Sequence, residues 1–150
     1  MPEDFVVLEL GSYKLKFDRN IFVGLDLKQP SPNLICIRRK MNEKNTAVIS
    51  INNYDAGKVE ASYVIKDIYR EFGEMKIAHM STVSEKLGNN LWHLFRITEG
   101  KSSHINVWIY ELDVEFMIKV IAAFTDIDDP IYSQIREMIA SIKIEKIDPV

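Results

Sequence analysis

The sequence predicts an α+β fold: a twisted antiparallel sheet with two helices packed mainly on one of its faces. Two observations lead to this prediction. Residues 90–124 contain three runs of strand-forming residues separated by polar turns, and both tryptophans lie in these runs. Residues 57–72 and 130–142 instead place apolar side chains at helical spacing. Because 150 residues is the size of one domain, we expect residues 1–150 to form a single α+β domain.

The overall composition argues against several classes of protein. The formal net charge is −3, whereas binding to nucleic acid needs a dense Lys/Arg face. No apolar run approaches the ~20 residues of a membrane-spanning helix. The start, MPEDFVVLEL, lacks the basic region of a secretory signal, and a single cysteine, Cys36, fits a reducing compartment. We therefore expect a cytoplasmic protein with no membrane span, in which Cys36 is a small core residue.

Strand patterns dominate the N-terminal part of the chain. Residues 5–10 alternate loosely between apolar and polar, and residues 13–18 alternate strictly, with Gly11-Ser12 as a turn between them. Residues 21–27 form a short apolar run that predicts another strand. Residues 28–33 contain two prolines, which lack backbone donors, so we predict a loop there.

A hairpin and a helix follow. Residues 34–39 and 46–51 are rich in β-branched and apolar residues and flank a polar segment, which predicts a hairpin. A helix is expected over residues 57–72. Asp55 suits its N-cap, because a carboxylate accepts hydrogen bonds from the first turn, and Gly73 suits the position just after its last turn.

The remaining elements surround the three-strand run. Residues 76–87 predict a strand before it. After it, Asp129 suits an N-cap and Pro130 a first helical turn, where the missing N–H costs nothing. One face of this second helix is apolar, and residues 144–150 predict a short edge strand. The apolar residues of that helical face are Ile131, Ile135, Met138, Ile139 and Ile142.

The long strand of residues 114–125 has one wholly apolar side, which we expect to face the core under the helices. That side carries Val114, Phe116, Ile118, Val120, Ala122 and Phe124, and the mixed side includes Met117. In the hairpin before it, a turn at Gly100-Lys101 places His93 opposite Trp108. One face then carries good core residues, namely Trp92, Leu94, Ile105, Val107 and Ile109. A slip of one residue would exchange the two faces.

The other face of this hairpin is the candidate binding site. It is apolar and aromatic, and such a surface, when exposed, usually marks a partner, a ligand or a dimer interface. The alternative is that a loop or residues 5–10 cover it. The residues of this predicted face are Leu91, His93, Phe95, His104, Asn106, Trp108 and Tyr110, and we take His93, Phe95, His104, Trp108, Tyr110 and Met117 as the candidate binding residues.

No catalytic or cofactor motif accompanies this face. His93 and His104 would lie on one face and can begin a zinc site, but no third ligand stands at a usual spacing. The acidic residues 126, 128 and 129 lack the glycine and terminal glutamate of a calcium loop and instead suit a helix start. There is no glycine-rich phosphate loop and no nucleophile elbow. We therefore predict no catalytic residues, no metal and no cofactor.

The order of elements and the segment VEFMIKVIAAFTDIDDPIYSQIREMIASIKI resemble the PsbP/Mog-type α+β superfamily. That superfamily includes a photosystem II subunit, a Ran-binding protein and the Eag-type chaperones of type VI secretion. The resemblance spans about residues 13–144, and its most specific part is a helix followed by SIKI. It implies a non-enzymatic binding module, since these proteins mostly act as scaffolds or chaperones.

Two hypotheses of function follow. The first is a protein-interaction, chaperone or adaptor module that uses the aromatic sheet face, with a link to bacterial secretion if the Eag-type resemblance holds. The second is a small-ligand-binding protein or an unrecognised enzyme with a pocket near His93 and His104. A homodimer that closes the aromatic face is a third, structural option.

Overall fold

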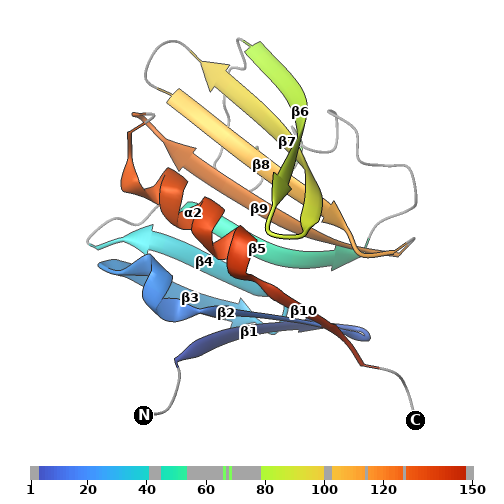
Figure 1. The fold of residues 1–150 in the computed structure, drawn as a ribbon. Coiled ribbons are helices and arrows are strands. Elements are labelled where there is room, and N and C mark those ends of the chain that lie inside the picture. The colour runs from blue at the N-terminus through green and yellow to red at the C-terminus, as the bar shows by residue number, and fades with distance from the viewer. Residues whose placement is uncertain are drawn as a thin grey trace.

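The computed structural model describes residues 4–40, 45–53, 66, 68, 79–99, 103–113, 115–126 and 128–147. These residues form two antiparallel sheets and a helix (Figure 1). The larger sheet has seven strands in the order β3-β4-β5-β9-β8-β7-β6. Its strands are β3 (Leu25–Ser31), β4 (Leu34–Arg39), β5 (Asn45–Asn53), β6 (His79–Leu87), β7 (Asn90–Glu99), β8 (Ser103–Glu111) and β9 (Phe116–Phe124).

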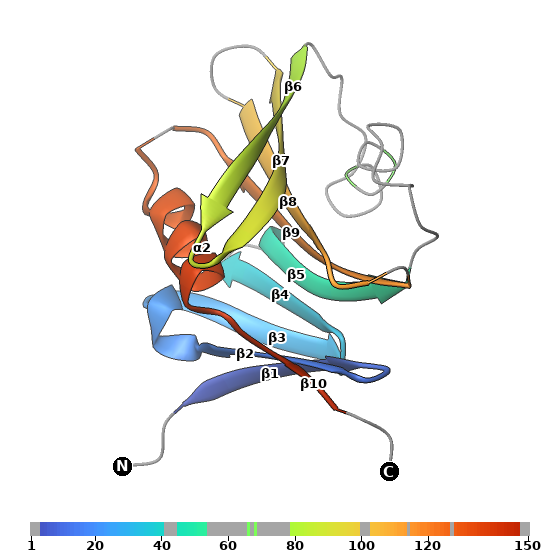
Figure 2. The same cartoon turned by 45° about the vertical axis from the view of Figure 1, so that its right-hand side comes forward.

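The smaller sheet has the order β1-β2-β10, with β1 (Phe5–Leu10), β2 (Tyr13–Asp18) and β10 (Lys143–Lys146). It lies next to β3 and β4 in both Figure 1 and Figure 2, and α2 (Pro130–Ser141) lies on one side of the larger sheet. The predicted antiparallel sheet is therefore confirmed. The strands predicted at residues 5–10, 13–18 and 34–39 are confirmed with the same bounds.

The region around the two prolines differs from the prediction. Residues 19–22 form a short 3₁₀ helix, η1 (Arg19–Phe22), because the Asp18 carboxylate accepts a hydrogen bond from the N–H of Asn20 at 2.9 Å. The strand begins at Leu25 and runs on to Ser31, so the predicted loop over residues 28–33 is wrong for residues 28–31 and is confirmed only as a turn at residues 32 and 33. A proline is tolerated here because β3 is an edge strand and its pairing with β4 is interrupted between Lys28 and Ser31.

The C-terminal helix confirms its predicted start. The Asp129 carboxylate accepts a hydrogen bond from the N–H of Ile131 at 3.0 Å, and it also pairs with Arg39 of β4. Asp129 therefore caps the helix and connects it to the larger sheet. In the turn before the helix, Asp126 accepts a hydrogen bond from the N–H of Asp128 at 2.9 Å. The predicted apolar face is buried at Ile131, Ile135, Met138 and Ile139. The tail continues as β10, which is an edge strand as predicted.

The prediction of two helices on one face is not confirmed. One helix, α2, is described with its bounds. The helix predicted over residues 57–72 lies outside the described residues except for Lys66 and Ile68, which are both helical. Ile68 is fully buried in a cluster on the side of the sheet opposite α2. No helix among the described residues is long and apolar enough to cross a membrane.

The core has two parts, one on each face of the larger sheet. The main core lies between that sheet, α2 and the smaller sheet, and it includes Leu8, Leu15, Ile49, Trp92, Trp108, Val120 and Ile135. The second cluster joins Ile68 to Phe95, Ile97, Ile105, Val107, Ile109 and Ile121. The predicted apolar side of residues 114–125 is confirmed as a core side at Ile118, Val120, Ala122 and Phe124.

A hydrogen bond links the smaller sheet to the turn before β9. The Tyr13 hydroxyl, whose residue is only 6% exposed, donates to Asp113 Oδ2 at 2.7 Å. The same carboxylate accepts from the N–H groups of Glu115 and Phe116 at 2.6 and 2.9 Å. The bond to Tyr13 lowers the pKa of Asp113, and the bond to Asp113 together with burial raises the pKa of Tyr13 to about 12.

We predict that Tyr13→Phe lowers the free energy of unfolding by about 1 kcal/mol at neutral pH, because one hydrogen bond is lost without a change of ring packing. The pH dependence has a definite sign. The raised pKa of Tyr13 contributes stability below its usual value of 10.0, and this is lost as the pH rises to about 12. The lowered pKa of Asp113 contributes stability that is lost as the pH falls through that pKa.

Urea unfolding of the two proteins from pH 7 to pH 12 measures this effect. Wild type should lose its advantage over Tyr13→Phe between about pH 10 and pH 12. A stability difference that stays constant across this range would show that the hydrogen bond to Asp113 does not raise the pKa of the Tyr13 hydroxyl.

Candidate functional site

The register of the β7–β8 hairpin decides where the candidate residues lie. The prediction placed His93 opposite Trp108, but the structure pairs His93 with Ile109 and Leu94 with Trp108. The reason is the length of the connection: Glu99 pairs with Ser103, so three residues separate the paired ends in place of the two assumed. Because side chains alternate along a strand, this slip of one residue exchanges the faces of β8.

The candidate residues consequently divide between the two faces. Trp108 lies on the α2 side with Trp92 and Leu94, and it is fully buried. Tyr110 and His104 lie on the same side: Tyr110 packs on Trp92 with ring centroids 5.2 Å apart, and His104 stacks on Phe124 at 5.5 Å.

The other three lie on the opposite side of the sheet. Phe95 is buried in the second cluster, and Met117 packs against that cluster. His93 is half-exposed, with its Nε2 3.4 Å from a carboxylate oxygen of Glu111. The six residues therefore do not form one surface, and His93 and His104 do not share a pocket.

The predicted cover by residues 5–10 is not found over Phe95. The smaller sheet, which contains residues 5–10, packs into the main core on the α2 side and does not cover Phe95. On Phe95's side, Ile68 packs into the second cluster. Among the described residues, no group of three His, Cys, Asp or Glu side chains is placed to hold a metal ion.

A polar contact that the sequence did not predict joins β6 to α2. The indole N–H of Trp108 donates to Glu85 Oε2 at 3.0 Å, and Arg136 of α2 pairs with Glu85 Oε1 at 2.6 Å. The Arg136 guanidinium carbon also lies 5.7 Å from the ring centroid of Tyr132. Glu85 is largely buried, with 15% of its side chain exposed, so these contacts hold the β6–β7 end of the edge strand firmly against the helix.

The two sheets have four edges, and three of them are protected. The edge strand β10 is only four residues long, and three of these are charged. Short, charged edge strands resist pairing with other chains. The edge strand β3 is interrupted beyond Lys28 and contains Pro30, which has no N–H to donate.

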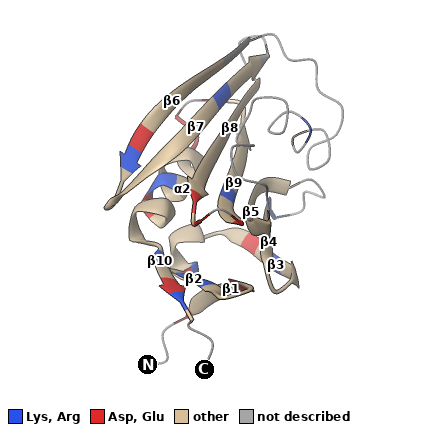
Figure 3. Ribbon diagram, turned by 90° about the vertical axis from the view of Figure 1, so that its right-hand side faces the viewer, with Lys and Arg blue, Asp and Glu red and all other residues tan. Residues whose placement is uncertain are grey.

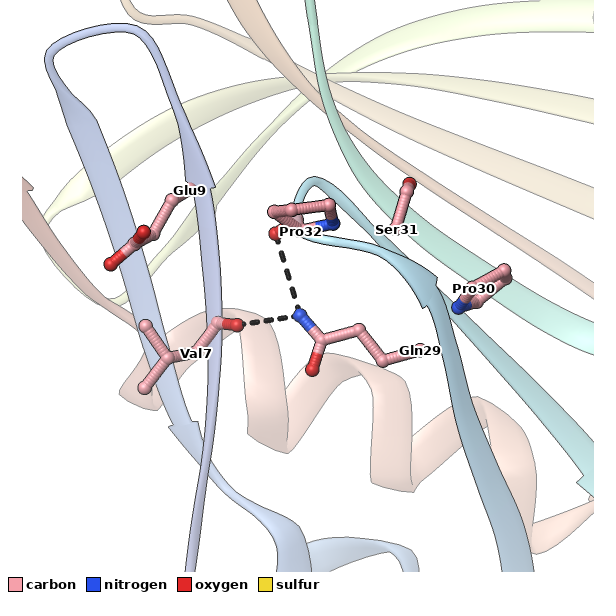
Figure 4. A pocket seen from close by; sticks show the side chains of 6 residues that line it. All are labelled: Val7, Glu9, Gln29, Pro30, Ser31 and Pro32. Atoms are coloured by element: carbon pink, nitrogen blue, oxygen red, sulfur yellow. Dashed lines mark hydrogen bonds between the residues drawn. The ribbon is translucent and has the colours of Figure 1, made fainter.

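The edge of β1 is covered by residues of β3 and of the turn that follows it (Figure 4). Gln29 Nε2 donates to the carbonyl oxygen of Val7 at 2.8 Å, and the N–H of Glu9 donates to the carbonyl oxygen of Pro32 at 2.8 Å. A cleft of about 480 Å³ lies between these strands and is lined by Val7, Glu9, Gln29, Pro30, Ser31 and Pro32. Gln29 spans this cleft, with a second contact of 3.4 Å from Nε2 to the Pro32 carbonyl. The side-chain N–H groups of Gln29 are therefore used in the contacts that connect the two sheets.

Within the described part of the chain, the fourth edge, β6, has none of these protections. It has nine residues and pairs with β7 without a bulge, from His79 opposite Thr98 to Leu87 opposite Asn90. Its first six residues, HMSTVS, contain no proline and no Lys, Arg, Asp or Glu. The charges of β6 lie near its end at the β6–β7 turn (Figure 3). No described strand pairs with its outer side, and Val83 is 40% exposed.

The direction of the backbone groups of β6 follows from its turn. In a hairpin with a two-residue turn, the residues that flank the turn form a hydrogen-bonded pair, and the direction alternates from there. Because Gly88 and Asn89 form such a turn, residues 81, 83, 85 and 87 face β7. The N–H and C=O groups of residues 80, 82, 84 and 86 therefore point away from the sheet.

The same rule can be checked on β1. Its turn to β2 also has two residues, with Leu10 opposite Tyr13, so the rule predicts that Val7 and Glu9 point outward. Their backbone groups do make the outward contacts with Gln29 and Pro32. The rule therefore holds on β1, where independent contacts test it, and we apply it to β6 on the strength of the same turn length.

Comparison with known proteins finds a similarity of fold only. No protein-family model matches the sequence, and no match is found among curated proteins. A crystal structure of a protein from Bacteroides thetaiotaomicron VPI-5482 is similar, with a TM-score of 0.53 and 12% sequence identity. The similarity covers 97% of this chain and 50% of that one, so this chain spans half the length of that protein.

A second similar structure is the solution structure of cyanobacterial PsbP (CyanoP) from Synechocystis sp. PCC 6803. It has a TM-score of 0.47 and 10% sequence identity, and the similarity covers 97% of this chain and 95% of that one. The resemblance to PsbP-type proteins is thus confirmed as a weak similarity of overall fold. At these identities the likeness concerns the fold alone, and function has to be argued from the site.

Proposed function

We propose that this chain is a non-enzymatic protein-interaction module that binds an extended segment of a partner protein along the outer edge of β6. The observation that supports this proposal is the contrast between the four sheet edges. Three are short and charged, interrupted by proline, or covered, whereas β6 presents a regular nine-residue edge. Such an edge is a template for strand addition, in which main-chain hydrogen bonds supply affinity.

The side chains beside this edge define the partner's chemistry. Val83 lies on the α2 side of the sheet, opposite Leu94, and Thr82 and Ser84 lie on the other side, opposite Phe95 and His93. All three are exposed. They are small, uncharged and compatible with a pleated surface, so the partner segment is expected to be uncharged and rich in Val, Ile and Thr.

In a chaperone or adaptor role, including one in bacterial secretion, the partner segment would bind along this same edge of β6. The aromatic face first considered for it is divided between two buried clusters. An open groove that shelters a helix would require those aromatic residues to be exposed on one side. Strand addition requires only that the outer side of β6 be accessible.

Proline substitution tests the proposal at single-residue resolution. Peptides that bind wild type are first selected from a displayed library of random 10-residue peptides. Thr82→Pro removes an outward N–H and leaves the β6–β7 hydrogen bonds in place, because residues 79, 81, 83, 85 and 87 are the ones that face β7. We predict a loss of peptide affinity of about 10-fold or more, since a bond is lost and the ring obstructs the incoming strand.

Thr82→Val is the matched control, because it keeps the N–H and the β-branched shape. Its affinity for the selected peptides should stay within about 2-fold of wild type, and circular dichroism should show that both variants are folded. Equal binding by Thr82→Pro and wild type would place the peptide site elsewhere and overturn the proposal.

A further inference from the structure

The outward groups of β6 have a symmetry that identifies one particular strand as a partner. Antiparallel strands pair through residues whose backbone groups face each other, and these alternate along each strand. On β6 the outward groups belong to residues 80, 82, 84 and 86, which are spaced evenly about Val83. A two-fold axis through Val83 therefore matches this set with itself: residue 80 meets residue 86 of the other strand, and residue 82 meets residue 84.

We infer that the partner strand is β6 of a second copy of this chain, paired antiparallel about a two-fold axis at Val83. This inference rests on the proposed use of the β6 edge. In this register all four outward residues find partners in both copies, so the two edges form roughly eight new backbone hydrogen bonds. If the axis moves by one residue, to Thr82 or Ser84, one of the four outward residues of each copy no longer meets a residue of β6 in the other copy.

The side chains are compatible with the same register. Val83 meets Val83 of the other copy in a pair without hydrogen bonds, where the side chains approach most closely. Thr82 meets Ser84 in both directions, and hydroxyl pairs of this kind are favourable. No two like charges stand opposite each other, because Glu85 meets Ser81 and Lys86 meets Met80. The contacts of Glu85 with Trp108 and Arg136 hold the end of β6 in place, so little ordering is needed on pairing.

The result would be one sheet continuous through both copies, with α2 of each copy on the same side. A two-fold axis perpendicular to the sheet maps each face onto itself, so the main cores of both copies lie on the same side of the continuous sheet. This is an isologous interface, the type that closes at two copies and does not propagate into fibres.

Crosslinking tests the register directly. Val83→Cys places a thiol beside the two-fold axis, and the Cα atoms of opposite residues in a pair without hydrogen bonds lie about 4.5 Å apart, within the range of roughly 4.4–6.8 Å that a disulfide spans. The native Cys36 is buried and does not compete. We expect Val83→Cys to form a covalent dimer under mild oxidation. Leu91→Cys on β7 is the control: it is 62% exposed yet lies away from the axis, so it should form no disulfide-linked dimer.

Analytical ultracentrifugation of the unmodified chain then measures association. Wild type and Thr82→Val should show a species of twice the 17.4 kDa chain mass, and Thr82→Pro should remain at 17.4 kDa up to at least a tenfold higher concentration. Excess of a selected peptide should dissociate the wild-type dimer. A wild type that stays monomeric but still binds peptides through β6 would refute the second copy and leave the proposed function standing. A dimer that persists in Thr82→Pro, or equal crosslinking of Leu91→Cys, would refute this interface.

Discussion

Trp108→Phe will lower the free energy of unfolding by about 2–4 kcal/mol, because the change removes both packing and a buried hydrogen bond. Trp108 is fully buried between the larger sheet and α2, with its ring 6.2 Å from that of Tyr132. A smaller ring leaves a cavity that the surrounding helix and strands fill only in part. The substitution also removes the donor to Glu85, a largely buried carboxylate that then relies on Arg136.

Trp92→Phe is the matched control, because the same change in volume has a different polar consequence. Trp92 is also fully buried, but its indole nitrogen has no hydrogen-bond partner among the described residues. Burying an unpaired donor costs roughly 1–3 kcal/mol, so removing it offsets part of the packing loss. We expect Trp92→Phe to cost at least about 1 kcal/mol less than Trp108→Phe. Chemical denaturation of both variants measures the difference, and equal losses would mean that the Trp108–Glu85 bond contributes nothing.

Gly88→Ala will destabilise the fold by about 2–4 kcal/mol, through backbone strain and a collision with α2. Gly88 opens the β6–β7 turn with a φ of +63°, a conformation that side chains with a Cβ adopt at a cost. A Cβ there would lie 2.6 Å from the carbonyl oxygen of Ala140. Because that oxygen belongs to the backbone of the helix, the contact can be relieved only by moving α2 or the turn.

Gly24→Ala separates the two causes. Gly24 has a similar φ of +80°, but an added Cβ would meet no atom of the described residues within 4 Å. Its substitution should cost only the backbone term, about 1 kcal/mol. Thermal melts of the two variants should therefore differ, with the lower midpoint for Gly88→Ala. If the two midpoints coincide, the turn does not pack against the helix as closely as the structure shows.

The sequence predicted an element correctly where neighbouring residues alone define it. Strict alternation of Tyr13, Leu15 and Phe17 predicted β2, and all three side chains are buried. Asp129 and Pro130 predicted the start of α2 because capping depends on neighbouring residues alone. In contrast, the loop predicted from the two prolines begins too early, because β3 continues through Pro30 to Ser31. Whether a proline breaks a strand depends on which side of the strand has a neighbour, and that is not a local property.

The candidate binding residues were predicted to share one face, and this differs from the structure for a related reason. Residues 103–111 are apolar on both sides of the strand, with Ile105, Val107 and Ile109 on one side and Trp108 on the other. Either face was therefore a plausible core, and a connection one residue longer was enough to exchange them. The edge of β6 was missed as well, because edge strands are defined by what does not pair with them.

The chain's local patterns determined that it folds as an antiparallel sheet with a capped C-terminal helix, because alternation, helical spacing and capping act within a few residues. Only the tertiary structure decided which strands are neighbours. β5 pairs with β9 across some 70 residues of sequence, and β10 returns to pair with β2. Those pairings set the register of the aromatic hairpin and left β6 at the margin of the sheet. Contacts between distant segments depend on how whole faces fit together, and a local pattern that suits both faces of a strand cannot choose between them.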